Sequence, residues 1–157
     1  MTLKLQSREL AAVKFRKVLP AYLAGEAAEC FIEVDARAGG LSNPAWFADF
    51  ARIRDIEVML TAEREKITDP ALRQAAYLEN LERVRAAQIA LLWEKCVIAW
   101  RTNILSDGEL LTCNMANFLE LAAVPVFEVR AAFTELSNAV LSAGDAEAEK
   151  TKADIKN

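Results

Sequence analysis

Apolar residues recur at helical spacing over most of the chain. The clearest start is Asn43-Pro44, with asparagine at the cap and proline at the first helical position. From there to about Thr68 the spacing of three and four residues predicts an amphipathic helix. Its apolar stripe consists of Trp46, Phe50, Ile53, Ile56 and Leu60.

Asp69-Pro70 is a second pair of capping residue and proline at the first helical position. It predicts another long helix, which we expect to run to about Trp100. From Ala86 onward this segment is apolar almost all round. A helix that loses its polar face is either wrapped by its neighbours or presented to a partner. Its first half is amphipathic through Leu78, Leu81 and Val84.

The segments that precede these helices are less regular. We predict a short helix from Ser7 to Leu19, with Ser7 as the cap and Pro20 as the end. Residues 28–36 have strand-like composition and partial alternation, so their structure stays open.

After the second long helix, Asp107-Gly108 is a turn signal and favours a small hairpin. A short helix follows, with Thr112 or Asn114 as its cap. The last helix begins at Pro125 and is predicted to end at Gly144. It carries the most regular apolar stripe of the chain, for which we favour a core position: Val129, Phe133, Leu136 and Val140.

These elements predict an all-α fold, a mainly helical single domain with room for one short β-strand pair or hairpin. A chain of 157 residues fits one domain and can bury a core without disulfides. We place the domain at residues 1–143 and predict a disordered C-terminal tail at 144–157. In that tail Ile155 is the one large apolar residue, so burial cannot offset the entropy of ordering.

The residue counts exclude much chemistry. The chain has no histidine, which removes imidazole acid–base catalysis, catalytic triads and histidine-containing zinc sites. Its three cysteines, Cys30, Cys96 and Cys113, have no paired spacing and favour free thiols in a reducing cytoplasm. We therefore expect no enzyme activity, no catalytic residue, no metal and no cofactor.

Charge and hydropathy argue against nucleic acid and membranes as partners. The formal net charge is −4, so the chain has no field that would gather nucleic acid. Its longest apolar runs, Ile89–Trp93 and Cys96–Trp100, are far shorter than the roughly 20 residues that cross a bilayer. We expect neither a nucleic-acid nor a membrane partner.

Residues 95–125 read KCVIAWRTNILSDGELLTCNMANFLELAAVP. This segment resembles the C-terminal half of the tail assembly chaperones of long-tailed bacteriophages, in which an apolar helix ends at a tryptophan and is followed by a DG turn, an asparagine cap and a helix before a proline. The matching positions are Val97, Trp100, Asp107, Gly108, Asn114, Asn117, Phe118, Leu121 and Pro125. Upstream, the aromatic helix start after a glycine loop is also similar, through Arg37, Gly39, Asn43, Pro44, Trp46 and Phe47.

The resemblance implies a small, helical, non-enzymatic chaperone in the host cytoplasm. Its partners would be the tape-measure protein, whose apolar helices it covers, and the tail-tube protein that polymerises around them. A homo-oligomer stays open. The alternative is a helical adaptor or regulatory subunit unrelated to phage; a small enzyme that uses carboxylates and arginine is a third class, disfavoured by the lack of histidine.

The partner-binding surface is expected on the second long helix and just after it. Trp93 and Trp100 lie seven residues apart, on nearly one face of the predicted helix, and either pack in the core or form a binding face. Arg101 beside Trp100 favours an exposed edge. The predicted partner-binding residues are Ile89, Leu92, Trp93, Trp100, Arg101 and Phe118.

Overall fold

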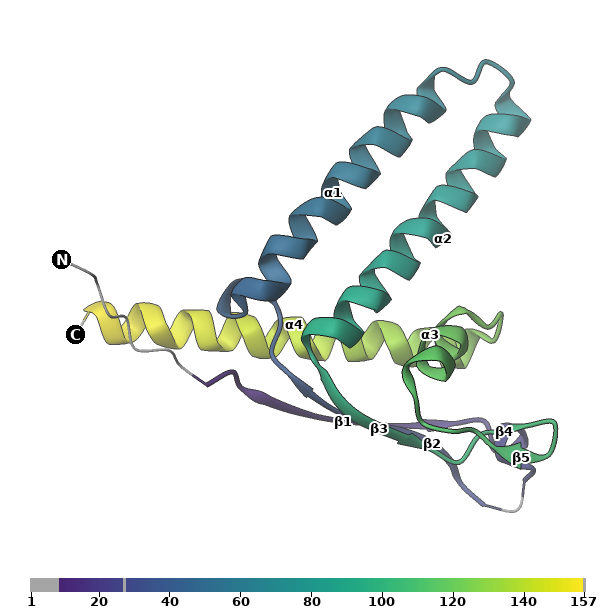
Figure 1. The fold of residues 1–157 in the computed structure, drawn as a ribbon, viewed down its shortest axis with the longest axis vertical. Helices are drawn as coiled ribbons and strands as arrows, with labels where there is room; N and C mark the ends of the chain where they lie inside the picture. Colours follow the sequence, from purple (N-terminus) through teal and green to yellow (C-terminus); the bar gives the residue numbers. More distant parts are fainter. Residues whose placement is uncertain (1–8, 27, 157) are drawn as a thin grey trace.

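The computed structural model describes residues 9–26 and 28–156 (Figure 1). A three-stranded antiparallel sheet has the order β1-β2-β3, with β1 at Ala12–Leu19, β2 at Cys30–Arg37 and β3 at Val97–Thr102. Strands β4 (Leu105–Ser106) and β5 (Glu109–Leu110) form a separate hairpin. The helices are α1 (Pro44–Glu65), α2 (Pro70–Lys95), α3 (Met115–Ala123) and α4 (Phe127–Lys156), with short 3-10 turns η1 (Ala21–Ala24) and η2 (Gly40–Ser42).

The fold is mixed α/β, so the all-α prediction is wrong. The segment predicted as a helix ending at Leu19 is strand β1, in which burial alternates with a period of two from Val13 to Leu19. The alternation is hard to see because Lys17 occupies a position on the inner side, where its Nζ lies 3.0 Å from Glu135 on α4. The predicted cap Ser7 lies outside the described residues.

The second long helix also ends earlier than predicted. Helix α2 stops at Lys95, and the apolar run that follows it forms β3 rather than further helical turns. The open segment 28–36 is strand β2, which pairs with β1 on one side and β3 on the other. Because Trp100 pairs with Val34, its indole lies on the buried face of the sheet.

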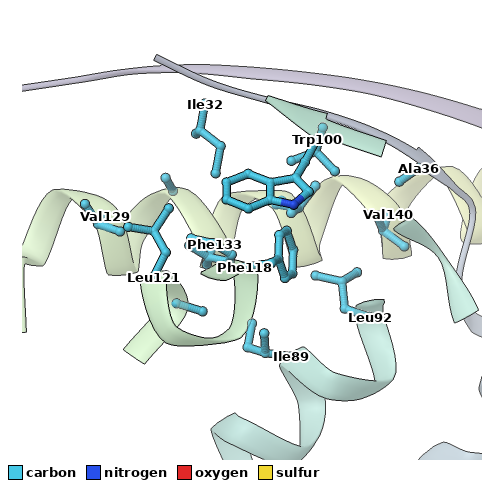
Figure 2. Close-up of a cluster of buried hydrophobic side chains, with 14 of the residues drawn as sticks. Ile32, Ala36, Ile89, Leu92, Trp100, Phe118, Leu121, Val129, Phe133 and Val140 are labelled. Carbon is cyan, nitrogen blue, oxygen red and sulfur yellow. The ribbon is translucent and has the colours of Figure 1, made fainter. Parts of the chain in front are cut away.

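The core lies between that face of the sheet, α3, α4 and the base of α2 (Figure 2). Phe118 is fully buried at its centre, with its ring centroid 5.0 Å from those of Trp93 and Phe133 and 5.5 Å from that of Trp100. Such tilted and edge-on pairs add stabilisation beyond the area they bury. The stripe favoured for the core is confirmed, since these residues are each 1% exposed: Val129, Phe133, Leu136 and Val140.

Local start and turn signals are confirmed by the structure. The side chains of Asn43, Asp69 and Asn114 each accept a hydrogen bond from a backbone N–H in the first turn of the helix that follows. Asp107 and Gly108 both adopt positive φ at the tip of the β4–β5 hairpin. Signals that act over a few residues therefore hold where the long-range fold prediction does not.

Gly144 does not end the last helix. The N–H of Gly39 donates to the carbonyl of Val140, and a Cβ at position 144 would lie 1.8 Å from the carbonyl oxygen of Gly39. Glycine is needed there because α4 and the 39–42 loop approach each other at backbone distance. Helix α4 runs on to Lys156, where we predicted a disordered tail from 144; Asn157 lies outside the described residues, and a domain boundary at 143 stays a prediction.

Gly144→Ala should lower the free energy of unfolding by about 1–3 kcal/mol, because the new methyl group must displace backbone. The loss should appear although alanine favours a helix by about 1 kcal/mol over glycine. Urea unfolding followed by circular dichroism measures it. Ser142→Ala, at an exposed position of the same helix, is the matched control and should stay within about 0.5 kcal/mol of the parent chain. Equal midpoints for the two variants would contradict the close approach.

The thiols should differ sharply in reactivity. Cys30 and Cys96 are buried and Cys113 is exposed. Burial raises the pKa of the Cys96 thiol to about 11 and also raises the pKa of Cys30. A thiol-specific reagent at mildly alkaline pH should modify Cys113 rapidly in the native protein and all three cysteines in denaturant, as read by mass spectrometry. Rapid modification of Cys96 in the folded chain would refute this assignment.

Candidate protein-binding surface

Helices α1 and α2 form an antiparallel hairpin that projects from the rest of the molecule (Figure 1). The buried residues of α2 are Ile89, Leu91 and Leu92, all near its C-terminal end, where the hairpin joins the body. In α1 only Ile53 and Leu60 are buried. Most of the hairpin is therefore supported by the contact between its own two helices.

A buried asparagine fixes the base of the hairpin. Asn43 is 3% exposed, and its Oδ1 accepts from the N–H of Trp46 at 3.2 Å in the first turn of α1. Its Nδ2 donates to the carbonyls of Ala38 at 3.1 Å and of Lys95 at 3.2 Å. One side chain thus holds the start of α1, the end of α2 and the preceding loop together, and its buried polar atoms are satisfied.

The tip and the seam of the hairpin use polar contacts as well. Asp69 accepts from the first backbone N–H groups of α2, and the Arg73 guanidinium donates to the carbonyl of Ile67 at 2.6 and 2.9 Å. In the seam, the Arg64 guanidinium carbon lies 5.0 Å from the centroid of the Tyr77 ring. Apart from the Tyr77 ring, these contacts use none of the large apolar side chains that the hairpin exposes.

The hairpin exposes many of its large apolar side chains. Of the sixteen large hydrophobic residues that are exposed in the described part of the chain, eight lie on α1 and α2. Isolated exposed residues are ordinary, but a concentration on one projecting element marks an interaction surface. We call these eight residues the hairpin surface: Phe47, Ile56, Val58, Met59, Leu72, Tyr77, Leu78 and Leu81.

Part of the hairpin surface continues a buried face of α2. Leu78 and Ile89 are eleven residues apart, as are Leu81 and Leu92, and eleven residues make about three turns of an α-helix. Each pair therefore lies on one face of the helix. Ile89 and Leu92 pack against the body through this face. Leu78 and Leu81 lie on the same face further along α2, where they are 54% and 49% exposed.

An apolar groove of about 320 Å³ lies between the hairpin base and α4. The rings of Trp46 and Phe50 stack in its wall at a centroid distance of 4.7 Å. Arg85 also lines it and donates to the Thr134 hydroxyl and the Arg130 carbonyl. Burial lowers the pKa of Arg85, and the neighbouring charge of Arg130 lowers it further. The lining contains no carboxylate, so the groove is suited to holding apolar side chains rather than to acid–base chemistry.

The residues predicted to bind a partner separate into two groups. Four are at most 4% exposed and hold the core together, so a partner could reach them only if the fold opened: Ile89, Leu92, Trp100 and Phe118. Trp93 is half-buried against Phe118. The structure brings these five together around one aromatic cluster. Arg101 lies apart from them, on the opposite face of the sheet.

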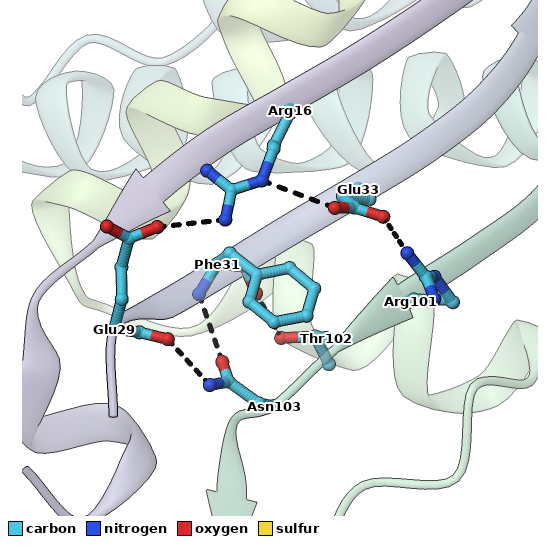
Figure 3. Close-up of polar contacts among 7 residues, drawn as sticks. All are labelled: Arg16, Glu29, Phe31, Glu33, Arg101, Thr102 and Asn103. Atoms are coloured by element: carbon cyan, nitrogen blue, oxygen red, sulfur yellow. Dashed lines mark hydrogen bonds and ion pairs between the residues drawn. The ribbon is translucent and has the colours of Figure 1, made fainter. Parts of the chain in front are cut away.

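That opposite face is a charged, ion-paired surface (Figure 3). The Arg16 guanidinium lies 2.8 Å from the Glu29 carboxylate and 3.2 Å from that of Glu33. Arg101, on β3, also pairs with Glu33, which lies on the neighbouring strand β2. The Arg101 guanidinium lowers the pKa of the Glu33 carboxyl. Exposed pairs of this kind contribute little stability, so the face is a solvated surface with its charges matched.

Most of the hairpin surface was missed from the sequence. The predicted stripe of α1 contains Ile56, but Phe47, Val58 and Met59 lie off it on other sides of the helix. The available signal was this spread itself, because a helix with apolar residues on every side needs more than one packing partner. In α2, Leu78 and Leu81 were assigned to an amphipathic stripe, which gave no indication that the body ends before it reaches them.

Comparison with protein-family models, with curated proteins and with solved structures finds no match to this chain. Among the described residues, no group of three or more cysteine, aspartate or glutamate side chains could hold a metal ion. In the same part of the chain no helix combines the length and the apolar character that a membrane crossing requires.

Trp100→Ala should destabilise the fold by about 3–5 kcal/mol, because it removes a buried ring that packs on Phe118. The indole also donates to the carbonyl of Asn114 at 3.2 Å, and this bond would be lost. Chemical denaturation measures the change. Trp46→Ala, at a half-buried position in the groove wall, should cost less. A Trp100→Ala variant as stable as the parent would contradict the core assignment.

Proposed function

We propose that this chain is an assembly chaperone that binds apolar helical segments of another protein through the hairpin surface. The observation that carries the proposal is the concentration of exposed apolar side chains on two helices that project from the body. A helix laid along such a pair would bury apolar side chains of both molecules. This is the helix-in-groove mode of recognition, and it needs no catalytic group.

The energetics favour contact along the length of the hairpin. Burial of apolar surface contributes about 25 cal/mol per Å², so full burial of one leucine or valine contributes about 1.5–3 kcal/mol. Several members of the hairpin surface buried together would outweigh the entropy lost when two chains associate. The groove between the hairpin base and α4 would hold an apolar residue at the end of the bound helix.

The resemblance of residues 95–125 to tail assembly chaperones supplies the identity of the partner. On that basis the bound helices are those of the tape-measure protein, held in the host cytoplasm until tail-tube subunits assemble around them. A tape-measure chain exposes apolar helical stripes that would otherwise aggregate. A non-phage adaptor would use the hairpin surface in the same way, and the two functions differ in the partner and not in the contact.

The experiment is co-expression with a segment of the tape-measure protein from the same genome. The parent chain should co-purify with the segment and raise its soluble yield. Val58→Glu with Leu78→Glu should lower that yield about tenfold or more, because each helix of the hairpin then carries a charge at an exposed apolar position. Both positions are more than half exposed, so the melting temperature should change little.

Ile98→Glu is the control, because Ile98 is 58% exposed but lies on β3 and not on the hairpin surface. This variant should keep the parent soluble yield. Aggregation of the tape-measure segment to the same extent with and without the parent chain would refute the phage function. Capture of the segment by the parent and the Val58→Glu/Leu78→Glu variant alike would refute the hairpin as the binding surface.

A further inference from the structure

A second apolar pocket lies where η1, the β4–β5 hairpin, α3 and the start of α4 meet. Its volume is about 260 Å³. We call it the end pocket. Its walls come from η1 and from residues 104–129, and they include Leu23, Leu105, Leu111, Leu121, Val126 and Val129.

Three residues that neighbour wall residues of the end pocket in the chain have exposed apolar side chains. Tyr22, Leu110 and Phe127 are 57%, 68% and 80% exposed. Each directly precedes or follows a wall residue in the chain, namely Leu23, Leu111 and Val126. An open pocket lined mainly by leucine and valine has the form of a site for an apolar anchor residue of a partner.

The charges around the end pocket are negative. Glu120 lines it, and four further carboxylates lie within three residues of a wall residue: Glu26, Asp107, Glu109 and Glu128. Within the described part of the chain, none of these five has an ion-pair partner. Two described cations, Arg101 and Arg130, lie within three residues of a wall residue, and they pair with Glu33 and Glu82. An apolar cavity with unmatched carboxylates at its rim selects apolar residues with cationic neighbours.

We propose that the end pocket binds a peptide segment of a partner protein in which one large apolar side chain is flanked by lysine or arginine. The apolar side chain enters the cavity, and the flanking cations lie against the carboxylates of the rim. The site is independent of the hairpin surface in position and in chemistry, so the proposal does not rest on the chaperone function.

A second copy of this chain is a poorer occupant. Two helical segments have the required composition, but their apolar residues, Ile53 between Arg52 and Arg54 and Val84 between Arg83 and Arg85, are buried and half-buried in the folded chain. In β1, Lys14, Arg16 and Lys17 flank Phe15 and Val18. Each of these three cations already pairs with a carboxylate of its own chain. Docking of β1 in the end pocket of another copy would break those ion pairs, and Phe15 faces the core. A partner with unpaired cations binds without this cost.

The probe is the peptide Lys-Lys-Leu-Trp-Lys-Lys, labelled for fluorescence anisotropy. Its two controls are Glu-Glu-Leu-Trp-Glu-Glu, which reverses the charges, and Lys-Lys-Ser-Ser-Lys-Lys, which removes the anchor. The probe should bind the full chain about tenfold or more tighter than either control. Raising the salt from about 0.05 to 0.5 M should weaken binding severalfold, because the rim is exposed to solvent.

Variants locate the contact. Glu109→Lys with Glu120→Lys should weaken probe binding by about tenfold or more. The matched control is Glu57→Lys with Glu63→Lys, which makes the same change of net charge at exposed positions on α1. It should bind the probe about as tightly as the parent chain does. On addition of the probe, amide resonances of η1, β4, β5 and α3 should shift, and those of the hairpin tip should not.

Three results would overturn the proposal: no binding of the probe at about millimolar concentration, equal binding of the charge-reversed peptide, and equal weakening by the two double variants. Concentration-dependent dimerisation that the probe displaces would instead identify a second copy as the occupant. Loss of tape-measure binding in Val58→Glu/Leu78→Glu with probe binding retained would separate the two sites. The converse, probe binding without any tape-measure binding by the parent chain, would leave this site standing after the chaperone function had failed.

Discussion

The projecting hairpin depends on one buried amide. Asn43 occupies a site with almost no solvent, and there it bonds the first turn of α1, the last carbonyl of α2 and the loop from β2. Leaving these polar groups unpaired in the interior would cost about 1–3 kcal/mol each. Helix α2 also meets the body from Glu82 to its C-terminal end, and this asparagine acts together with those contacts to set the position from which the hairpin surface is presented.

Local signals predicted where α1, α2 and α3 begin, but not the sheet and not where α2 and α4 end. As caps, Asn43, Asp69 and Asn114 each accept from a backbone N–H two or three residues further on, so their capping role could be inferred from the sequence alone. Strands β1 and β3 have partners that are 11 to 70 residues away, and their short apolar runs are equally compatible with helix. Only the pairing with β2, which is buried on one face, decides between the two structures.

Gly144 illustrates a second limit of sequence interpretation. A glycine late in a helical pattern is typical of a helix end, and the sequence alone favours that interpretation. In the structure position 144 has no room for a side chain, because the carbonyl oxygen of Gly39, in a loop from another part of the chain, packs directly against the α4 backbone. The candidate sites have the same limit, because burial of Trp100 and exposure of Val58 depend on where the body ends, and no local pattern encodes that boundary.

The two candidate sites differ in what they demand of a partner. The hairpin surface is extended, and the charged residues around it on α1 and α2 are of both signs. It can therefore accept many apolar helices with little discrimination between them. The end pocket is small, is built from elements of the body, and has carboxylates near its walls, so it discriminates between partner segments by their shape and charge. A protein that must cover a long apolar chain and also meet one particular assembly partner needs both properties. Separation of the two surfaces allows both contacts to be made at the same time.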